Sequence, residues 1–356
     1  MTLVRCNRKS WAFTLCVIFA LLLSGCAPKN QGAALSQTDT EWVADQLNEA
    51  VKGKSLDLAT LFDDSQPDWL ASNLKNLAQI NFTAGGAGRL TARWRPGPDD
   101  EDAWHEVQVA ARCSNKLCKI TKMSPLEGQP APIWLSTPID VVTLGDLTVL
   151  GRGVERWVGA GQQGIETASK LSQALKKDWD GRLIIQIVPT QPAFHAVTGT
   201  ADFDDDWAIT WRQDFANPGS PAAMAIVVND VLSLGREGLQ SAFLIAHESV
   251  HVATGGLGEP VKGRKWVLEG LAESLALNSF PQMAEASTAL LRQHCDLVNP
   301  PGDEELLSSD PDTRELAYAR AAMTVRLLNG DDNLIRELWT NPDTEIPETA
   351  LVNDAC

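Results

Sequence analysis

The sequence is poor in positive charge. It holds 30 lysine and arginine residues against 46 aspartate and glutamate residues, which gives a formal net charge of -16 and an isoelectric point near 4.7. Nucleic acid and anionic lipid surfaces repel a chain of this charge. The sequence therefore predicts no nucleic-acid partner and no binding to a membrane through overall charge.

Several other features are absent or scarce. The chain has no glycine-rich phosphate loop, no internal repeat and no long low-complexity tract, and it carries only five histidines and one tyrosine. Hydrophobic residues make up 44% of its 356 residues, which is enough for two buried cores. Length and composition therefore favour two or three globular domains.

The first 26 residues have the pattern of an export signal. Basic residues precede an apolar run, Trp11 to Leu23, that is too short for a comfortable transmembrane helix. The run ends in Leu-Ser-Gly-Cys, which resembles a bacterial lipobox. The resemblance implies a lipid on Cys26, a tether over residues 27–39 and a place on the extracytoplasmic face of the cell membrane. An ordinary cleaved secretion signal is the alternative.

Four cysteines remain for an oxidising compartment once Cys26 carries lipid and the two earlier cysteines are removed with the signal. An even number favours disulfides. Cys113 and Cys118 bracket four residues and could close a hairpin, which leaves Cys295 to pair with Cys356. Metal binding is the weaker alternative, because neither pair has the two-residue spacing of a zinc site.

Residues 40–130 predict a small α+β domain in which helices precede strands. Helical spacing of apolar residues occurs over residues 42–51 and 70–77, and a half-buried strand pattern of alternating residues follows over residues 90–95 and 107–113. The order resembles nuclear-transport-factor or cystatin-like cones, although no motif anchors that comparison. A spacer, a substrate-recognition module and an internal inhibitor all remain open as roles.

Pro130-Ala131-Pro132 predicts a domain boundary, and residues 131–356 form the second predicted domain. Residues 140–150 are strand-like, and apolar residues from Val154 to Trp179 trace one face of a long helix. Leu183 to Val188, apolar except for Gln186, predicts a buried strand. Further segments are two strands, residues 207–211 and 223–228, and two late helices, residues 283–295 and 313–328.

Two of the five histidines lie in the pattern H-E-x-x-H, at His247 and His251. Helix positions four apart lie one above the other, so both imidazoles can reach one metal ion, and Glu248 beside them is placed to take a proton from a metal-bound water. Gly255-Gly256 stops the helix directly afterwards. A buried helix with two incidental histidines is the alternative reading.

Downstream, Trp266 to Glu273 reads W-V-L-E-G-L-A-E. H-E-x-x-H followed by W-x-x-E-G-x-A resembles the gluzincin zinc metallopeptidases, especially their aminopeptidase-N-like branch. The resemblance implies a zincin-like domain, with Glu269 as the third zinc ligand and Glu273 as a carboxylate that hydrogen-bonds a ligating histidine. Seventeen residues separate His251 from Glu269, one fewer than is usual there. A solvated carboxylate is the alternative for Glu273.

The same resemblance includes Tyr318 but does not hold at Ala225. In this branch a tyrosine opens a later helix and hydrogen-bonds the oxyanion that forms when water attacks the substrate carbonyl. Tyr318 matches this tyrosine by position. A packing role is an equal alternative. Its substrate-binding glutamate, in a G-x-M-E-N strand, corresponds here to Ala225, so aminopeptidase specificity does not carry over. The remaining histidines, His105, His195 and His294, are expected to be structural or at the surface, with His195 on a loop between strands.

Together these patterns predict an α+β protein that hydrolyses peptide bonds in peptide or protein substrates outside the cytoplasmic membrane. The resemblance implies one Zn²⁺ per chain, bound by His247, His251 and Glu269, with Glu248 as general base. An inactive zincin-like lipoprotein that serves as a binding or envelope-scaffold module is the alternative. Substrate identity and oligomeric state stay open.

Overall fold

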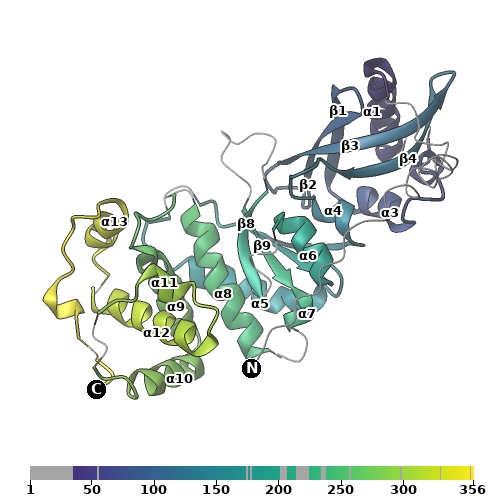
Figure 1. The fold of residues 1–356 in the computed structure, drawn as a ribbon. Helices are drawn as coiled ribbons and strands as arrows, with labels where there is room; N and C mark the ends of the chain where they lie inside the picture. The colour runs from purple at the N-terminus through teal and green to yellow at the C-terminus, as the bar shows by residue number, and fades with distance from the viewer. Residues whose placement is uncertain are drawn as a thin grey trace, which may run out of the picture. The chain divides into compact units, whose positions relative to one another are not determined.

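An antiparallel sheet with helices on one face forms the N-terminal part of the structure (Figure 1). The computed structural model describes residues 35–53, 56–173, 175–176, 179–200, 207–213, 224–233, 238–255, 258–296, 299–328, 330–352 and 354–356. The helices are α1 (Gln37–Val51), α2 (Leu58–Leu61) and α3 (Trp69–Asn76). The strands, neighbours in chain order, are β1 (Gln79–Gly86), β2 (Arg89–Arg95), β3 (Ala103–Ser114) and β4 (Leu117–Pro125).

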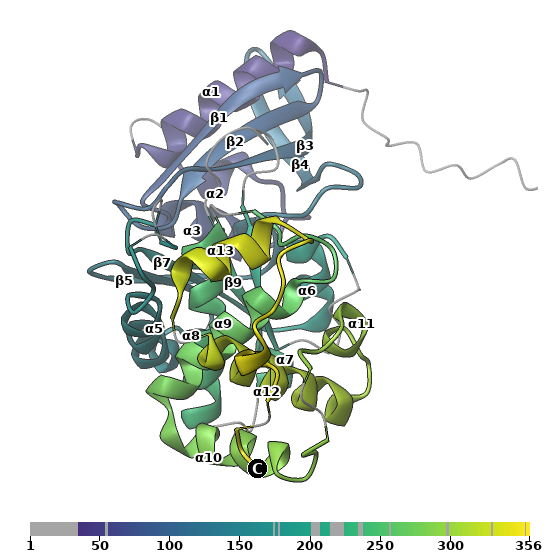
Figure 2. The ribbon, with the colours of Figure 1, turned by 90° about the vertical axis from the view of Figure 1, so that its left-hand side faces the viewer.

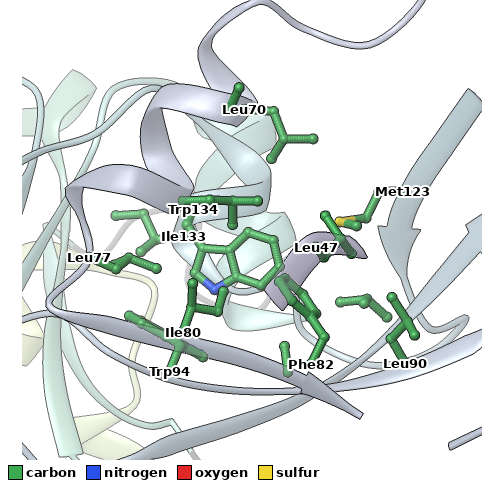
Figure 3. Close-up of a cluster of buried hydrophobic side chains, with 14 of the residues drawn as sticks. Leu47, Leu70, Leu77, Ile80, Phe82, Leu90, Trp94, Met123, Ile133 and Trp134 are labelled. Carbon is green, nitrogen blue, oxygen red and sulfur yellow. The ribbon is translucent and has the colours of Figure 1, made fainter. Parts of the chain in front are cut away.

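Alternation of buried and exposed residues gives this sheet one apolar face. Phe82, Ala92 and His105 lie opposite one another across β1, β2 and β3, and all three are buried. The apolar face packs against the helices, and Trp134 of the short helix α4 (Ile133–Ser136) lies in the same core (Figure 3). Its ring meets that of Phe82 edge to face, with centroids 6.1 Å apart.

A second sheet, with five strands, follows. Its order is β5-β6-β7-β9-β8; β6, β7 and β9 are parallel, and both edge strands, β5 and β8, are antiparallel to their neighbours. Together the two sheets and their helices confirm the predicted α+β class. The strands are β5 (Asp140–Leu144), β6 (Leu147–Gly151), β7 (Leu183–Val188), β8 (Ala208–Arg212) and β9 (Met224–Asn229).

Helices pack against this second sheet, and the chain after β9 is built of helices (Figures 1 and 2). The helices α5 (Glu155–Ala168) and α8 (Leu239–Thr254) share one core with the sheet, and α6 (Gln191–Thr198) packs on the opposite face. The short helix α7 (Asp230–Ser233) follows β9. The C-terminal helices are α9 (Lys265–Ser279), α10 (Pro281–Leu291), α11 (Asp303–Leu306), α12 (Pro311–Leu327), α13 (Asp332–Thr340) and the 3-10 turn η2 (Glu348–Ala350).

Both predicted disulfides are present. Cys113 and Cys118 face each other across β3 and β4, and Cys295 holds the last residue, Cys356. The predicted domain boundary near residue 130 stays a prediction, and the cores on its two sides are continuous, because Ile133 and Trp134 belong to the N-terminal core.

Two local predictions were wrong. The helix expected from Val154 to Trp179 ends at Ala168, and Leu171 and Leu175 are buried from turns instead. Helical spacing reports which residues are buried, and it does not require the backbone to stay helical. His195, expected on a loop, lies in α6, whose N-terminus is capped by the Thr190 hydroxyl and which ends at Gly199 with a positive φ of 71°.

His105 makes the stability of the N-terminal part depend on pH. Its side chain is buried, its Nδ1 accepts a hydrogen bond of 3.1 Å from the Trp94 indole, and burial lowers its pKa to about 3. Between pH 6.5 and pH 3 the unfolded chain therefore binds a proton that the folded chain does not. The contribution of His105 to stability is complete above pH 6.5 and falls as the pH drops through this window.

We expect this one group to cost the wild type about 2 kcal/mol of unfolding free energy between pH 7 and pH 5. The His105→Gln variant keeps an acceptor for Trp94 and does not titrate, so its loss over the same interval should be smaller by that amount. Urea denaturation at both pH values measures it. Equal pH dependence in both proteins would contradict the assignment.

Candidate metal centre

The helix α8 brings His247 and His251 together, as their spacing predicts. Their Nε2 atoms lie 3.0 Å apart, and the rings meet with centroids 4.9 Å apart. His247 is 6% exposed, so one side of the pair is closed to solvent by the protein interior. The apolar residues of α8 before the motif pack in the same core as the five-stranded sheet, which fixes the direction in which both imidazoles point.

Glu269, on α9, completes a triangle of donor atoms with the two histidines. Its Oε2 lies 3.4 Å from His247 Nε2 and 3.3 Å from His251 Nε2. A tetrahedral ion with bonds of about 2.0–2.1 Å keeps its ligand atoms about 3.3 Å apart. The three edges of 3.0, 3.4 and 3.3 Å therefore have the size that a metal ion of this kind requires.

Two carboxylates lie at this centre, and their surroundings distinguish them. Ligand atoms of His247, Glu248 and His251 all lie within 4.8 Å of one another, so this group could hold a metal ion. Glu269 is nonetheless closer to the imidazoles, whereas Glu248 accepts a hydrogen bond of 2.8 Å from the Thr210 hydroxyl. Glu269 therefore lies in contact with both imidazoles, and Glu248 lies beside these three groups and is held by Thr210.

Glu273 lies one helical turn after Glu269 and contacts the back of the first histidine. His247 Nδ1 is 2.9 Å from Glu273 Oε2, and the Glu273 side chain is 14% exposed. A proton held on Nδ1 by this carboxylate leaves the lone pair on Nε2, the atom that faces His251 and Glu269. Glu273 is therefore in contact with the site and is not simply solvated.

Without an ion, the centre is a group of buried charges. Burial alone would lower the pKa of His247, but hydrogen bonds to Glu269 and Glu273 and the negative charges of Glu273 and Glu248 raise it to about 10. Burial alone would raise the pKa of Glu269, but the charge of His251 and hydrogen bonds from both imidazoles hold it well below its usual range. The carboxylate is thus ionised, as a metal ligand must be.

The pKa of Glu248 is shifted in the opposite direction. Burial raises it above its usual range, and the charges of His251 and His247 and the hydrogen bond from Thr210 only partly offset that effect. Neighbouring carboxylates whose pKa values are displaced in opposite directions are suited to different chemical roles.

Close packing between helices places α12 against α9. A Cβ atom on Gly270 would lie 2.4 Å from the carbonyl oxygen of Ala321, so the glycine that follows Glu269 in the motif lets the two helices approach. Tyr318 projects from α12, and its ring centroid is 5.6 Å from that of His247. The structure therefore brings Tyr318 to the centre, and its action on an oxyanion stays a prediction.

The other sequence candidates lie elsewhere. Ala225 is fully buried in the core on the opposite face of the sheet, while the side chain of Met224 lies beside Gly255 at the end of α8. His105 and His195 belong to the N-terminal sheet and to α6. Cys26 and Gly256 lie outside the described residues. The sequence does not point to Thr210, because a single threonine in a strand belongs to no motif that would indicate a functional role.

Comparisons with known proteins add no relative: no family model, no curated protein and no solved structure matches the chain. The metal-binding pattern and its geometry thus stand without support from a family. Among the described residues, no helix is both long and apolar enough to cross a membrane.

Proposed function

We propose that the protein is a zinc-dependent peptidase of the gluzincin type. The observation that carries the proposal is the donor triangle of His247, His251 and Glu269, with Glu248 directly beside it. Two imidazole nitrogens and one carboxylate oxygen are a donor set that suits zinc, and three protein ligands leave a fourth position open for water, which is typical of catalytic rather than structural zinc.

A bound zinc ion would supply Lewis acidity and lower the pKa of a water in its open position. Glu248 would accept the proton of the attacking water and later pass it to the nitrogen of the leaving amine, so the carboxylate ends as it began. Its raised pKa suits both steps, because the group must bind a proton and release it within one cycle. Glu273 would keep the His247 ring oriented throughout.

The position of strand β8 beside Glu248 favours a polypeptide as the substrate. β8 is an edge strand of the five-stranded sheet, and its Thr210 contacts Glu248 of the metal-binding helix. An exposed strand edge can pair with an extended peptide and hold it alongside the site. Ala225 offers no carboxylate for a free amino group. Aminopeptidase specificity is therefore not part of the proposal.

The N-terminal sequence supports a location outside the cytoplasmic membrane. Its lipobox-like residues end at Cys26, and two disulfides in the described residues suit an oxidising compartment. We infer that a lipid on Cys26 anchors the protein to the membrane.

Glu248→Gln separates an enzyme from an inactive scaffold. The amide keeps the shape of the side chain but cannot accept the proton, so turnover of a peptide library should fall by about 10² to 10⁴ while one zinc per chain is retained. Metal analysis and peptide cleavage measure both quantities. The His247→Ala, His251→Ala double variant is the control, because it should lose the zinc. A wild type that binds zinc and cleaves nothing would favour the scaffold.

Tyr318→Phe tests the tyrosine. If its hydroxyl contacts the oxyanion, kcat should fall about 10² to 10³-fold with little change in KM, because that contact forms mainly in the transition state. Steady-state kinetics on a cleaved peptide, with zinc content as control, decides the point. A packing tyrosine would leave kcat unchanged.

Cys26→Ala tests the anchor. The variant should leave the membrane fraction and carry no lipid label, because the acylated thiol is lost. Cell fractionation with labelled fatty acid measures both properties. A variant that stays membrane-bound and labelled would show that the anchor lies elsewhere.

A further inference from the structure

Thr210 joins the edge strand β8 to the metal-binding helix. Its hydroxyl lies 2.8 Å from Glu248 Oε2 and 3.0 Å from the main-chain oxygen of Glu248, 38 residues away in sequence. A hydroxyl has one proton to donate, and the shorter contact goes to the charged acceptor, which forms the stronger bond. Thr210 and Glu248 are both at least partly buried, so little water competes for this bond.

The Glu248 side chain needs such a partner to hold one position. It has three rotatable bonds between the backbone and its carboxylate, and its neighbours on α8 bond elsewhere: His247 contacts His251, Glu269 and Glu273. Within the described part of the chain, Thr210 is the hydrogen-bond donor that reaches the Glu248 carboxylate. The orientation of the proposed base therefore depends on a residue of the sheet.

We propose that Thr210 is a positioning residue that holds Oε2 of Glu248 and leaves Oε1 to exchange the proton. The inference rests on the proposed peptidase function. Thr210 keeps its own proton throughout, and Glu248 gains one from the attacking water and gives it to the leaving nitrogen, so the cycle balances. Because β8 is an edge strand of the five-stranded sheet, the same bond ties the base to the strand that would align a peptide substrate.

Thr210→Val removes the hydroxyl and keeps the shape of the side chain. A misplacement of about 1 Å at a reacting group can cost about 10²-fold in rate, so we expect kcat to fall about 10 to 100-fold with KM nearly unchanged. Thr210→Ser restores the hydroxyl and should recover most of kcat. Thr198→Val, which removes a buried threonine hydroxyl in α6, is the matched control and should leave kcat unchanged.

Two further measurements separate positioning from simple loss of structure. In the Glu248→Gln background, Thr210→Val should cost almost nothing more, because the group that it positions is already disabled. Crystal structures should show one Glu248 carboxylate conformer in the wild type and in Thr210→Ser, and more than one in Thr210→Val. Zinc content should be equal in all variants.

The outcomes distinguish this inference from the function on which it rests. Full activity in Glu248→Gln would overturn the proposed peptidase mechanism itself. An inactive Glu248→Gln together with an unchanged kcat in Thr210→Val would overturn the role of Thr210 alone. If Thr210→Val fails to fold, Thr210→Ser and Thr210→Ala replace it, and equal kcat values in that pair would also overturn the role.

Discussion

The site depends on three donor atoms that meet where two helices cross. His247 and His251 come from one helix and Glu269 from the next, and the distances between their donor atoms are 3.0 to 3.4 Å. Helix axes normally lie about 8–10 Å apart, so short or absent side chains are needed wherever the packing is tighter. Gly164 meets Ser249 of α8, and Gly270 meets Ala321 of α12, at distances that leave no room for a Cβ atom.

Buried charge is the second constraint on this centre. Two imidazoles and three carboxylates share a small volume that is largely shielded from water. Such a group is costly to bury unless each charge has a partner, and a divalent cation would supply the missing positive charge. The arrangement thus makes physical sense as a metal site, and as a purely structural cluster it would be an expensive one.

The rest of the fold supports the centre at a distance. The five-stranded sheet gives α8 an apolar surface to pack on. Thr210, on its edge strand β8, donates a hydrogen bond to Glu248, the proposed general base. The core of the N-terminal sheet takes in Trp134 from the connecting segment (Figure 3) and continues to Val188 and Phe194 of the second part. A continuous core of this kind links the N-terminal sheet mechanically to the segment that leads into the metal-binding part of the chain.

The sequence alone determined the features that depend on local periodicity. Helical spacing placed His247, Glu248 and His251 together, alternation identified β2, a run of apolar residues identified β7, and proximity paired Cys113 with Cys118. The resemblance of one motif to a known family added Glu269, whose carboxylate lies 3.3 to 3.4 Å from both imidazoles. Each of these predictions concerns residues whose relation follows from backbone geometry or from a short, specific motif.

Only the tertiary structure decided the rest. It placed Thr210 on Glu248, turned Glu273 toward His247 and set Tyr318 beside the same ring. It also ended α5 at Ala168, although the apolar spacing continued. The physical reason is the same in each case. A contact between distant residues depends on how whole elements cross and pack, and periodicity within one element carries no information about that crossing.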